Sequence, residues 1–228
     1  MAPSRYGRLA ALATLMLLFT GCDLMSLPYF LSGADSRRPP ALMSLAPDAK
    51  EKGKRNRVLV MAYCGLVADP QLVTADREVT RRVIGSLHEA LQQDKDKDKV
   101  TFVAASQIDR YKDAHPDWHI NLVDAGKHFH ADYVVYLDLQ TMSLFESKSY
   151  NQFLHAQADV QVKVIDMRSP DDPKKEREFR CEYPTTGPEL AEDRRLEEFR
   201  NSFYQEIATR VCWLFAAHEP THLTMGGQ

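Results

Sequence analysis

Long apolar runs are missing from this sequence of 228 residues, because none reaches the roughly 18 to 20 residues that a transmembrane helix requires. An excess of charge is missing as well. The formal net charge is only −3, so the chain carries no strong field that would attract nucleic acid. Glycine and proline, with 10 and 12 residues, are too few for collagen-like or low-complexity classes. We therefore expect an ordinary globular chain of one domain or two small ones, without a nucleic-acid partner.

Short catalytic motifs are also absent. The sequence contains no Gly-x-Ser-x-Gly, no P-loop, no His-Glu-x-x-His and no glycine-rich phosphate turn. Such motifs place a nucleophile, a metal or a phosphate at a defined point of a fold. We expect no catalytic residue and no cofactor, and hence a protein that is not an enzyme.

The first 22 residues are typical of an export signal. Arg5 and Arg8 precede an apolar stretch of 11 residues that ends at Phe19, too short for a membrane span and suited to a signal core. It leads into Leu18-Phe19-Thr20-Gly21-Cys22, which resembles the lipobox of bacterial lipoproteins. The resemblance implies cleavage between Gly21 and Cys22, a diacylated Cys22 thiol and an acylated new amino terminus. The alternative is a plain secretory signal that is cut elsewhere, with Cys22 incidental.

This interpretation divides the chain into four parts. Residues 1–21 are the signal peptide, and residues 22–56 are the lipidated cysteine and a flexible tether interrupted by prolines. Residues 57–218 form a single α/β domain, and residues 219–228 form a disordered tail. Three acyl chains exceed the two signals that stable anchoring needs. The protein is then expected in the bacterial cell envelope, attached by its lipid to a membrane and facing the periplasm, with inner and outer membrane both open.

The first half of the domain alternates strands and helices. Apolar strands are predicted at 57–64, at 100–105, and from 133 to either 139 or 145. A helix within 70–92 follows from apolar residues at i+4 spacing. Ser106 and Asp109 resemble a capping pair that opens a short helix before Pro116, and another helix is predicted at about 120–129. The β-α-β-α-β order favours parallel strand pairing.

The second half predicts a hairpin and a long helix. Residues 153–167 alternate apolar and polar side chains, as do 178–183, which is typical of half-buried antiparallel strands. Thr186 and Glu189 fit a capping box for a helix over 188–218. Its apolar residues repeat every four positions: Phe199, Phe203, Ile207, Val211 and Phe215. We expect a mixed α/β sheet in the order β-α-β-α-β-β-β-α, with this long C-terminal helix packed on it.

The segment 123–136 carries a resemblance to a group of envelope domains. It contains Ala131-Asp132-Tyr133-Val134 at the opening of a strand, preceded by a short helix. In this it resembles the amino-terminal domain of TolB, the periplasmic domain of CsgG, and LpoB. His130 stands where that group has a glycine that takes a positive φ. The resemblance implies a non-catalytic protein that binds an envelope protein or assembles with itself, and the alternative is a secretion-pore subunit or accessory of the CsgG type.

Histidines gather in one part of the sequence. His115, His119, His128 and His130 lie within 16 residues, and together with Asp132 they raise the alternative of a metal-dependent envelope enzyme that uses the His115–His130 cluster. The candidate metal ligands are His128, His130 and Asp132. The interpretation we favour is that these are surface or capping histidines and that no metal is bound.

Three cysteines remain beyond Cys22. Cys64, Cys181 and Cys212 lie within apolar patterns, so we expect them to be small buried side chains. The alternative is that two of the three form a disulfide. The sequence does not indicate which surface a partner would use.

Overall fold

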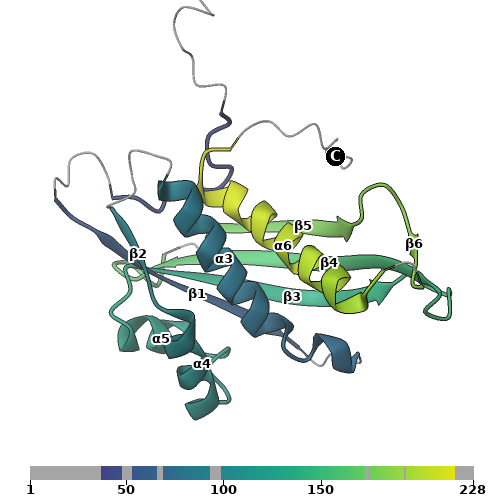
Figure 1. The fold of residues 1–228 in the computed structure, drawn as a ribbon. Coiled ribbons are helices and arrows are strands. Elements are labelled where there is room, and N and C mark those ends of the chain that lie inside the picture. The colour runs from purple at the N-terminus through teal and green to yellow at the C-terminus, as the bar shows by residue number, and fades with distance from the viewer. Residues whose placement is uncertain are drawn as a thin grey trace, which may run out of the picture. The chain divides into compact units, whose positions relative to one another are not determined.

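The computed structural model describes residues 37–47, 53–65, 69–92, 99–172, 175–192 and 194–218 (Figure 1). The strands are β1 (Asn56–Cys64), β2 (Val100–Phe102), β3 (Tyr133–Phe145), β4 (Phe153–Asp166), β5 (Lys175–Tyr183) and β6 (Glu189–Leu190). The helices are α3 (Ala75–Gln92), α4 (Ala105–Ala114), α5 (Leu122–His128) and α6 (Leu196–Phe215), with a 3₁₀ turn at Pro70–Leu72. The predictions for Gly21, Cys22 and the tail 219–228 concern residues outside the described ranges.

The strands form one mixed sheet in the order β2-β1-β3-β4-β5, and β6 pairs with β4 at its end. β1 runs parallel to both β2 and β3. β3, β4 and β5 then pair antiparallel in turn. The predicted mixed α/β sheet is therefore confirmed, and the long form of the third strand, which reaches Phe145, is the correct one.

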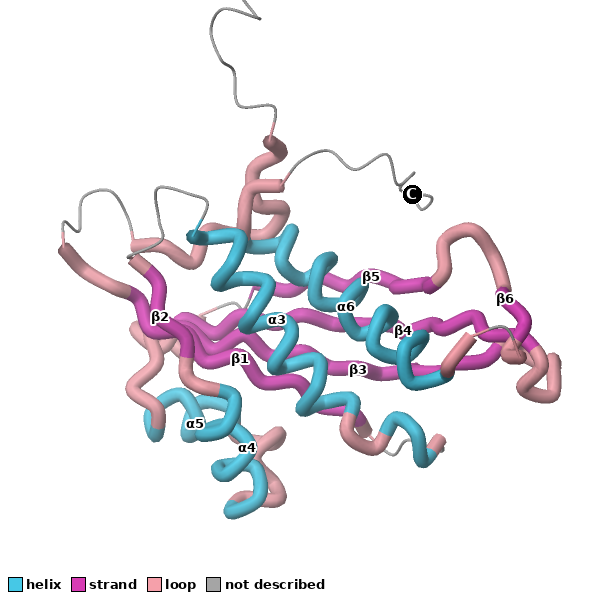
Figure 2. Tube along the Cα trace, viewed as in Figure 1, coloured by secondary structure: helices cyan, strands magenta, loops and turns pink. Residues whose placement is uncertain are grey.

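Helices cover the two faces of the sheet unequally. Val58, Val60 and Ala62 of β1 join a large core with α3 and α6, whereas Leu59 and Met61 point to a smaller core with α4 and α5. Figure 2 shows α3 and α6 side by side along the sheet, and α4 and α5 gathered beside β1 and β2. Among the described residues, no helix covers the polar face of β4 and β5. Gln161 on β4 donates there to Glu178 on β5 over 2.8 Å.

The C-terminal helix packs on the sheet as predicted. Its apolar stripe is at most 1% exposed: Phe199, Phe203, Ile207, Val211 and Phe215. It covers the small side chains Ala156 and Ala158 of β4, which are at most 1% exposed as well. Small residues on the strand let the aromatic rings approach closely, so this layer closes the core.

Both predicted helix caps are wrong. The helix expected from residue 188 begins at Leu196, because Glu189 and Leu190 pair with Leu154 and Phe153 of β4 instead. Its cap residue is Arg195, which makes no side-chain capping bond. The helix expected to open at Ser106 begins one residue earlier, at Ala105. β2 is also shorter than predicted and ends at Phe102 instead of residue 105.

Part of the predicted tether belongs to the fold. Residues 38–47 lie along the end of α6, where the amide N–H of Leu42 donates to the Leu214 carbonyl over 2.9 Å. Leu45 is fully buried, and its carbonyl accepts from the Asn56 side chain at 2.9 Å. A flexible tether through residue 56 is therefore wrong for this segment. Apolar burial holds it despite its prolines, which break a helix but do not prevent an extended chain from packing.

Candidate functional site

The structure gathers three of the four candidate histidines around one pocket. His115 at the end of α4, His128 at the end of α5 and His130 just after it line a pocket of about 440 Å³ with Arg57 and Arg110. We call it the histidine pocket. It opens at the amino ends of β1 and β3, because Arg57 is the second residue of β1 and His130 precedes β3. His130 has a φ of 49°, in the positive range that was expected at this position.

Aromatic rings form a wall of the histidine pocket. The ring of Tyr111 stacks on His115 with centroids 4.3 Å apart, and it lies 4.8 Å from the ring of His128. Phe129 packs edge-on against Tyr111 at 5.3 Å. The Nδ1 atom of His115 lies 3.0 Å from the Tyr111 carbonyl. A carbonyl only accepts, so Nδ1 carries a proton and Nε2 is the atom left for other contacts.

The charges around the histidine pocket are positive. Neither Arg57 nor Arg110 pairs with a carboxylate within the described ranges, and the Nε of Arg110 donates to the Ser106 carbonyl. The nearby carboxylates are engaged elsewhere. Asp132 accepts from the backbone N–H of Arg57 at 2.7 Å, and Asp124 accepts from the Asn121 side chain at 2.5 Å. Burial, with Asp124 adding to it, raises the pKa of Tyr111 above its ordinary value.

The candidate metal ligands of the alternative interpretation do not converge. Asp132 is bound to the backbone of β1, and His119 lies apart, stacked on Tyr63 with centroids 4.3 Å apart. His115 and His128 have ring centroids 6.3 Å apart. In the described ranges, no group of three His, Cys, Asp or Glu side chains is placed to hold a metal ion. The geometry therefore lends no support to the metal-dependent alternative.

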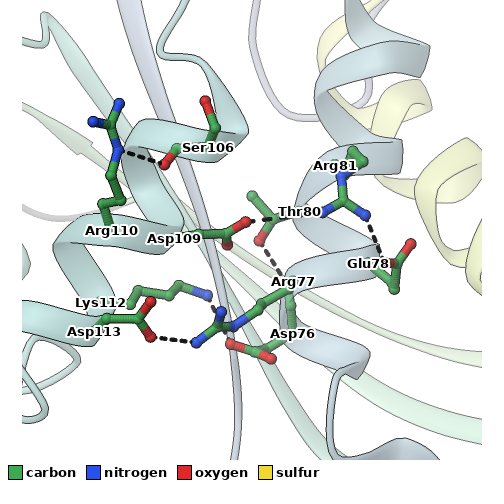
Figure 3. A network of polar contacts seen from close by, with 10 residues as sticks. All are labelled: Asp76, Arg77, Glu78, Thr80, Arg81, Ser106, Asp109, Arg110, Lys112 and Asp113. Atoms are coloured by element: carbon green, nitrogen blue, oxygen red, sulfur yellow. Dashed lines mark hydrogen bonds and ion pairs between the residues drawn. The ribbon is translucent and has the colours of Figure 1, made fainter.

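A second polar cluster, which sequence reasoning missed, lies at the carboxyl end of β1 (Figure 3). The ammonium of Lys112 donates to Asp76 Oδ2 at 2.8 Å and to the Ala62 carbonyl at 2.7 Å, and it lies 4.7 Å from the centroid of the Trp118 ring. Only 4% of the Lys112 side chain is exposed. Burial lowers the pKa of Lys112, and the Asp76 carboxylate partly offsets this.

Surface ion pairs extend this cluster. Arg77 Nη2 lies 2.5 Å from Asp113 Oδ1, and Arg81 bridges Glu78 and Asp109. In open α/β sheets, ligands bind at the carboxyl ends of strands whose connections leave to opposite faces. β1 is such a strand here, because its neighbours β2 and β3 are reached over opposite faces. Here the side chains of Lys112 and Trp118 fill the place where a ligand would bind in such a sheet. We therefore interpret the cluster as a structural one.

The turn between β3 and β4 exposes large apolar side chains. We call residues 146–153 the hairpin tip. Tyr150 is 93% exposed, and Phe153 pairs with Leu190 of β6, which is 50% exposed. Lys148, Tyr150 and Asn151 all have a positive φ, between 52° and 65°. The only sequence signal for this feature is an aromatic residue in a polar turn.

The remaining cysteines are free and buried or partly buried. Cys64, Cys181 and Cys212 form no disulfide in the structure. Burial raises the thiol pKa of Cys64 and Cys212 to about 11 and that of Cys181 to about 12. Thiols with such values are not ionised at neutral pH, which agrees with the expected role of small apolar side chains.

Within the described parts of the chain, no helix combines the length and the hydropathy that crossing a membrane requires. No protein-family model matches the sequence, and a search of curated proteins finds no relative.

Several solved structures from bacteria have a similar chain trace. A PelC dodecamer from Paraburkholderia phytofirmans has a TM-score of 0.40 and 10% identity, over 78% of this chain and 93% of that one. Lipoprotein GNA1162 from Neisseria meningitidis has a TM-score of 0.41 and 11% identity, over 68% and 99%. A hypothetical protein from Chlamydia trachomatis has a TM-score of 0.39 and 14% identity, over 69% and 96%. Likeness at this level transfers neither a function nor a partner to this chain.

Proposed function

We propose that this protein is a lipid-anchored, non-catalytic lipoprotein of the bacterial cell envelope. Its α/β domain binds another envelope protein or a second copy of itself through the hairpin tip. The lipobox that ends at Cys22 supports the anchor. The exposure of Tyr150 at the hairpin tip is the observation that carries the binding role.

The hairpin tip has the properties of a contact surface. Aromatic side chains are enriched at protein interfaces, where a rigid ring buries much area at small entropic cost. Two backbone hydrogen bonds order the turn. The N–H of Glu146 donates to the Phe153 carbonyl and the N–H of Gln152 donates to the Ser149 carbonyl, each at a distance of 3.0 Å. Non-glycine residues at positive φ cost about 1–3 kcal/mol each. A turn that holds three of them while exposing a tyrosine is difficult to explain by stability alone.

Fatty-acid labelling tests the anchor. Labelled fatty acid should be incorporated into the natural chain and lost in Cys22→Ser, because the acylated thiol is removed. Cys64→Ser is the matched control, since it removes a thiol of the folded domain and leaves Cys22 in place. Retained labelling in Cys22→Ser would show that the anchor is assigned wrongly.

Site-specific crosslinking tests the hairpin tip. A photoreactive amino acid at position 150 should give one discrete adduct in intact cells, whereas the same group at Ile120 should give none. Ile120 is a fair control, because it is also apolar and 75% exposed but lies in the loop before α5. An adduct of twice the chain mass identifies self-assembly, and one of another mass identifies a partner. Equal adducts at both positions, or none at 150, would contradict the proposal.

A further inference from the structure

We propose that the histidine pocket binds a phosphate group carried by an envelope ligand, with Arg57 and Arg110 as its charge partners. This inference is independent of the hairpin tip and goes beyond partner binding. It starts from the set of side chains that line the pocket, which includes two arginines, three histidines and Gln107, and no carboxylate. Side chains of this kind donate hydrogen bonds or carry positive charge, so they complement an anion.

The two arginines lack the ion pair to a carboxylate that several other arginines of the described residues make. These ion-paired arginines are Arg77, Arg81, Arg168, Arg180, Arg194, Arg195 and Arg210. Arg57 and Arg110 have no such pair within the described ranges, although they come from β1 and α4 and line the same pocket. Two guanidinium groups that line one pocket, neither of them ion-paired within the described ranges, form a place where an anion is favoured. The planar guanidinium also matches two phosphate oxygens at once.

The histidines add donors at defined atoms. The contact between His115 Nδ1 and the Tyr111 carbonyl fixes this ring, so its Nε2 is the atom available to a ligand. The ring of His128 lies 4.8 Å from the same Tyr111 ring and 6.3 Å from His115, and His130 lines the pocket from just beyond α5. Each imidazole can offer a ring N–H as a hydrogen-bond donor, so the three histidines add to the donors that the two arginines supply.

A metal cation is the less favourable occupant of the same pocket. Two arginines would repel it, and the carboxylate of Asp132 is engaged with the backbone of β1. The volume of about 440 Å³ exceeds what a bare phosphate fills. The remaining space, beside the rings of Tyr111 and Phe129, accommodates the group that bears the phosphate. This group can belong to a phospholipid headgroup or to a soluble phosphate compound, and the experiment separates the two.

The test is a titration of the mature protein, purified in a non-ionic detergent and followed by NMR of the histidine ring protons. One arm adds inorganic phosphate at constant ionic strength, with chloride as the reference. A second arm adds dihexanoylphosphatidylglycerol, with dihexanoylphosphatidylcholine as the zwitterionic control. We expect saturable shifts of three histidine signals in at least one arm. Shifts with phosphate alone indicate a soluble ligand, and shifts with the anionic lipid but not the zwitterionic one indicate a headgroup.

Variants show whether binding in the histidine pocket causes these shifts. Arg57→Gln combined with Arg110→Gln should weaken binding about tenfold or more, because two charge-assisted contacts are lost. Arg177→Gln on β5 is the matched control and should bind as the natural chain does. Far-UV circular dichroism of each variant verifies that it folds, and the single variants Arg57→Gln and Arg110→Gln replace the double one if it does not. No saturable shift in either arm, or equal loss in Arg177→Gln, would overturn the proposal.

Discussion

The ammonium of Lys112 joins α4 to the first turn of α3, where it lies 2.8 Å from Asp76 Oδ2. The same nitrogen donates to the Ala62 carbonyl on β1, so one side chain connects three elements across both faces of the sheet. α3 packs mainly on one face and α4 on the other, and Ile84 of α3 is an apolar side chain that also contacts the smaller core. The long cationic side chain of Lys112 adds a polar link between the two helices at the end of the strand.

Asp76→Asn should destabilise the protein by about 3 kcal/mol, because it leaves a buried ammonium without its counter-charge. Urea unfolding of the chain from Asp23 to Gln228 measures the change. Arg81→Gln is the control, since its guanidinium is half exposed and such pairs contribute about 1 kcal/mol or less. Equal midpoints for Asp76→Asn and the natural chain would mean that the pair does not hold the helices.

Phe203→Ala should lower the free energy of unfolding by about 3–5 kcal/mol, because it empties a fully buried site beneath α6. Gln205→Ala, two residues along the same helix and exposed, should stay within about 0.5 kcal/mol. Chemical denaturation of both variants separates packing from binding. If Phe203→Ala unfolds at the natural midpoint but loses the crosslinked adduct, α6 is an interface and not a core helix.

Replacing each of two helical glycines with alanine should change the stability of the protein in opposite directions. A Cβ at Gly126 in α5 would lie 2.5 Å from Met167 Sδ and 2.8 Å from Val134 Cγ2, so Gly126→Ala should cost about 1–3 kcal/mol. Gly85 in α3 has open space around its Cβ direction, and Gly85→Ala should stabilise by about 0.5–1 kcal/mol. Thermal unfolding of the pair checks this. A stabilised Gly126→Ala would mean that α5 does not pack closely on β3.

Lowering the pH should remove the stabilising interaction between Asp166 and Arg168 at the end of β4. Hydrogen bonds from Arg168 lower the pKa of Asp166 below its ordinary value of about 3.9. A carboxylate whose pKa is lowered in the fold stabilises above its unfolded pKa, and this stabilisation is lost as pH falls through the folded pKa. Unfolding of Arg168→Gln and the natural chain should therefore differ at pH 6 and converge near pH 2. A difference that is constant with pH would rule out the carboxylate as the cause.

The sequence predicted the elements that a repeating pattern defines. The alternation from Leu154 to Val164 and the four-residue repeat of α6 each placed a set of buried residues correctly. The start of α6 could not be found in this way. Glu189 has the chemistry of a capping residue, but pairing with β4 takes its backbone, and that partner lies more than thirty residues earlier in the chain.

The candidate sites were less predictable for a related reason. The histidines were visible as a cluster, but Arg57 lies far from them in the chain and reaches the histidine pocket only because β1 pairs with β3. Lys112 and Asp76 show no pattern that distinguishes them from surface charges. Their pairing depends on two helices that meet at the end of a strand, which is a property of the topology and not of a local segment.

The paired ends of the folded unit determine where it would take mechanical load. Arg38 and His218 exchange two backbone hydrogen bonds, so the polypeptide enters and leaves the fold at the same point. Tension applied through the amino-terminal segment would act on this pair and on the Leu42–Leu214 contact before it reached any strand of the sheet. With the proposed lipid anchor at Cys22, a pulling force would first release residues 38–47 and would leave the hairpin tip and the histidine pocket folded.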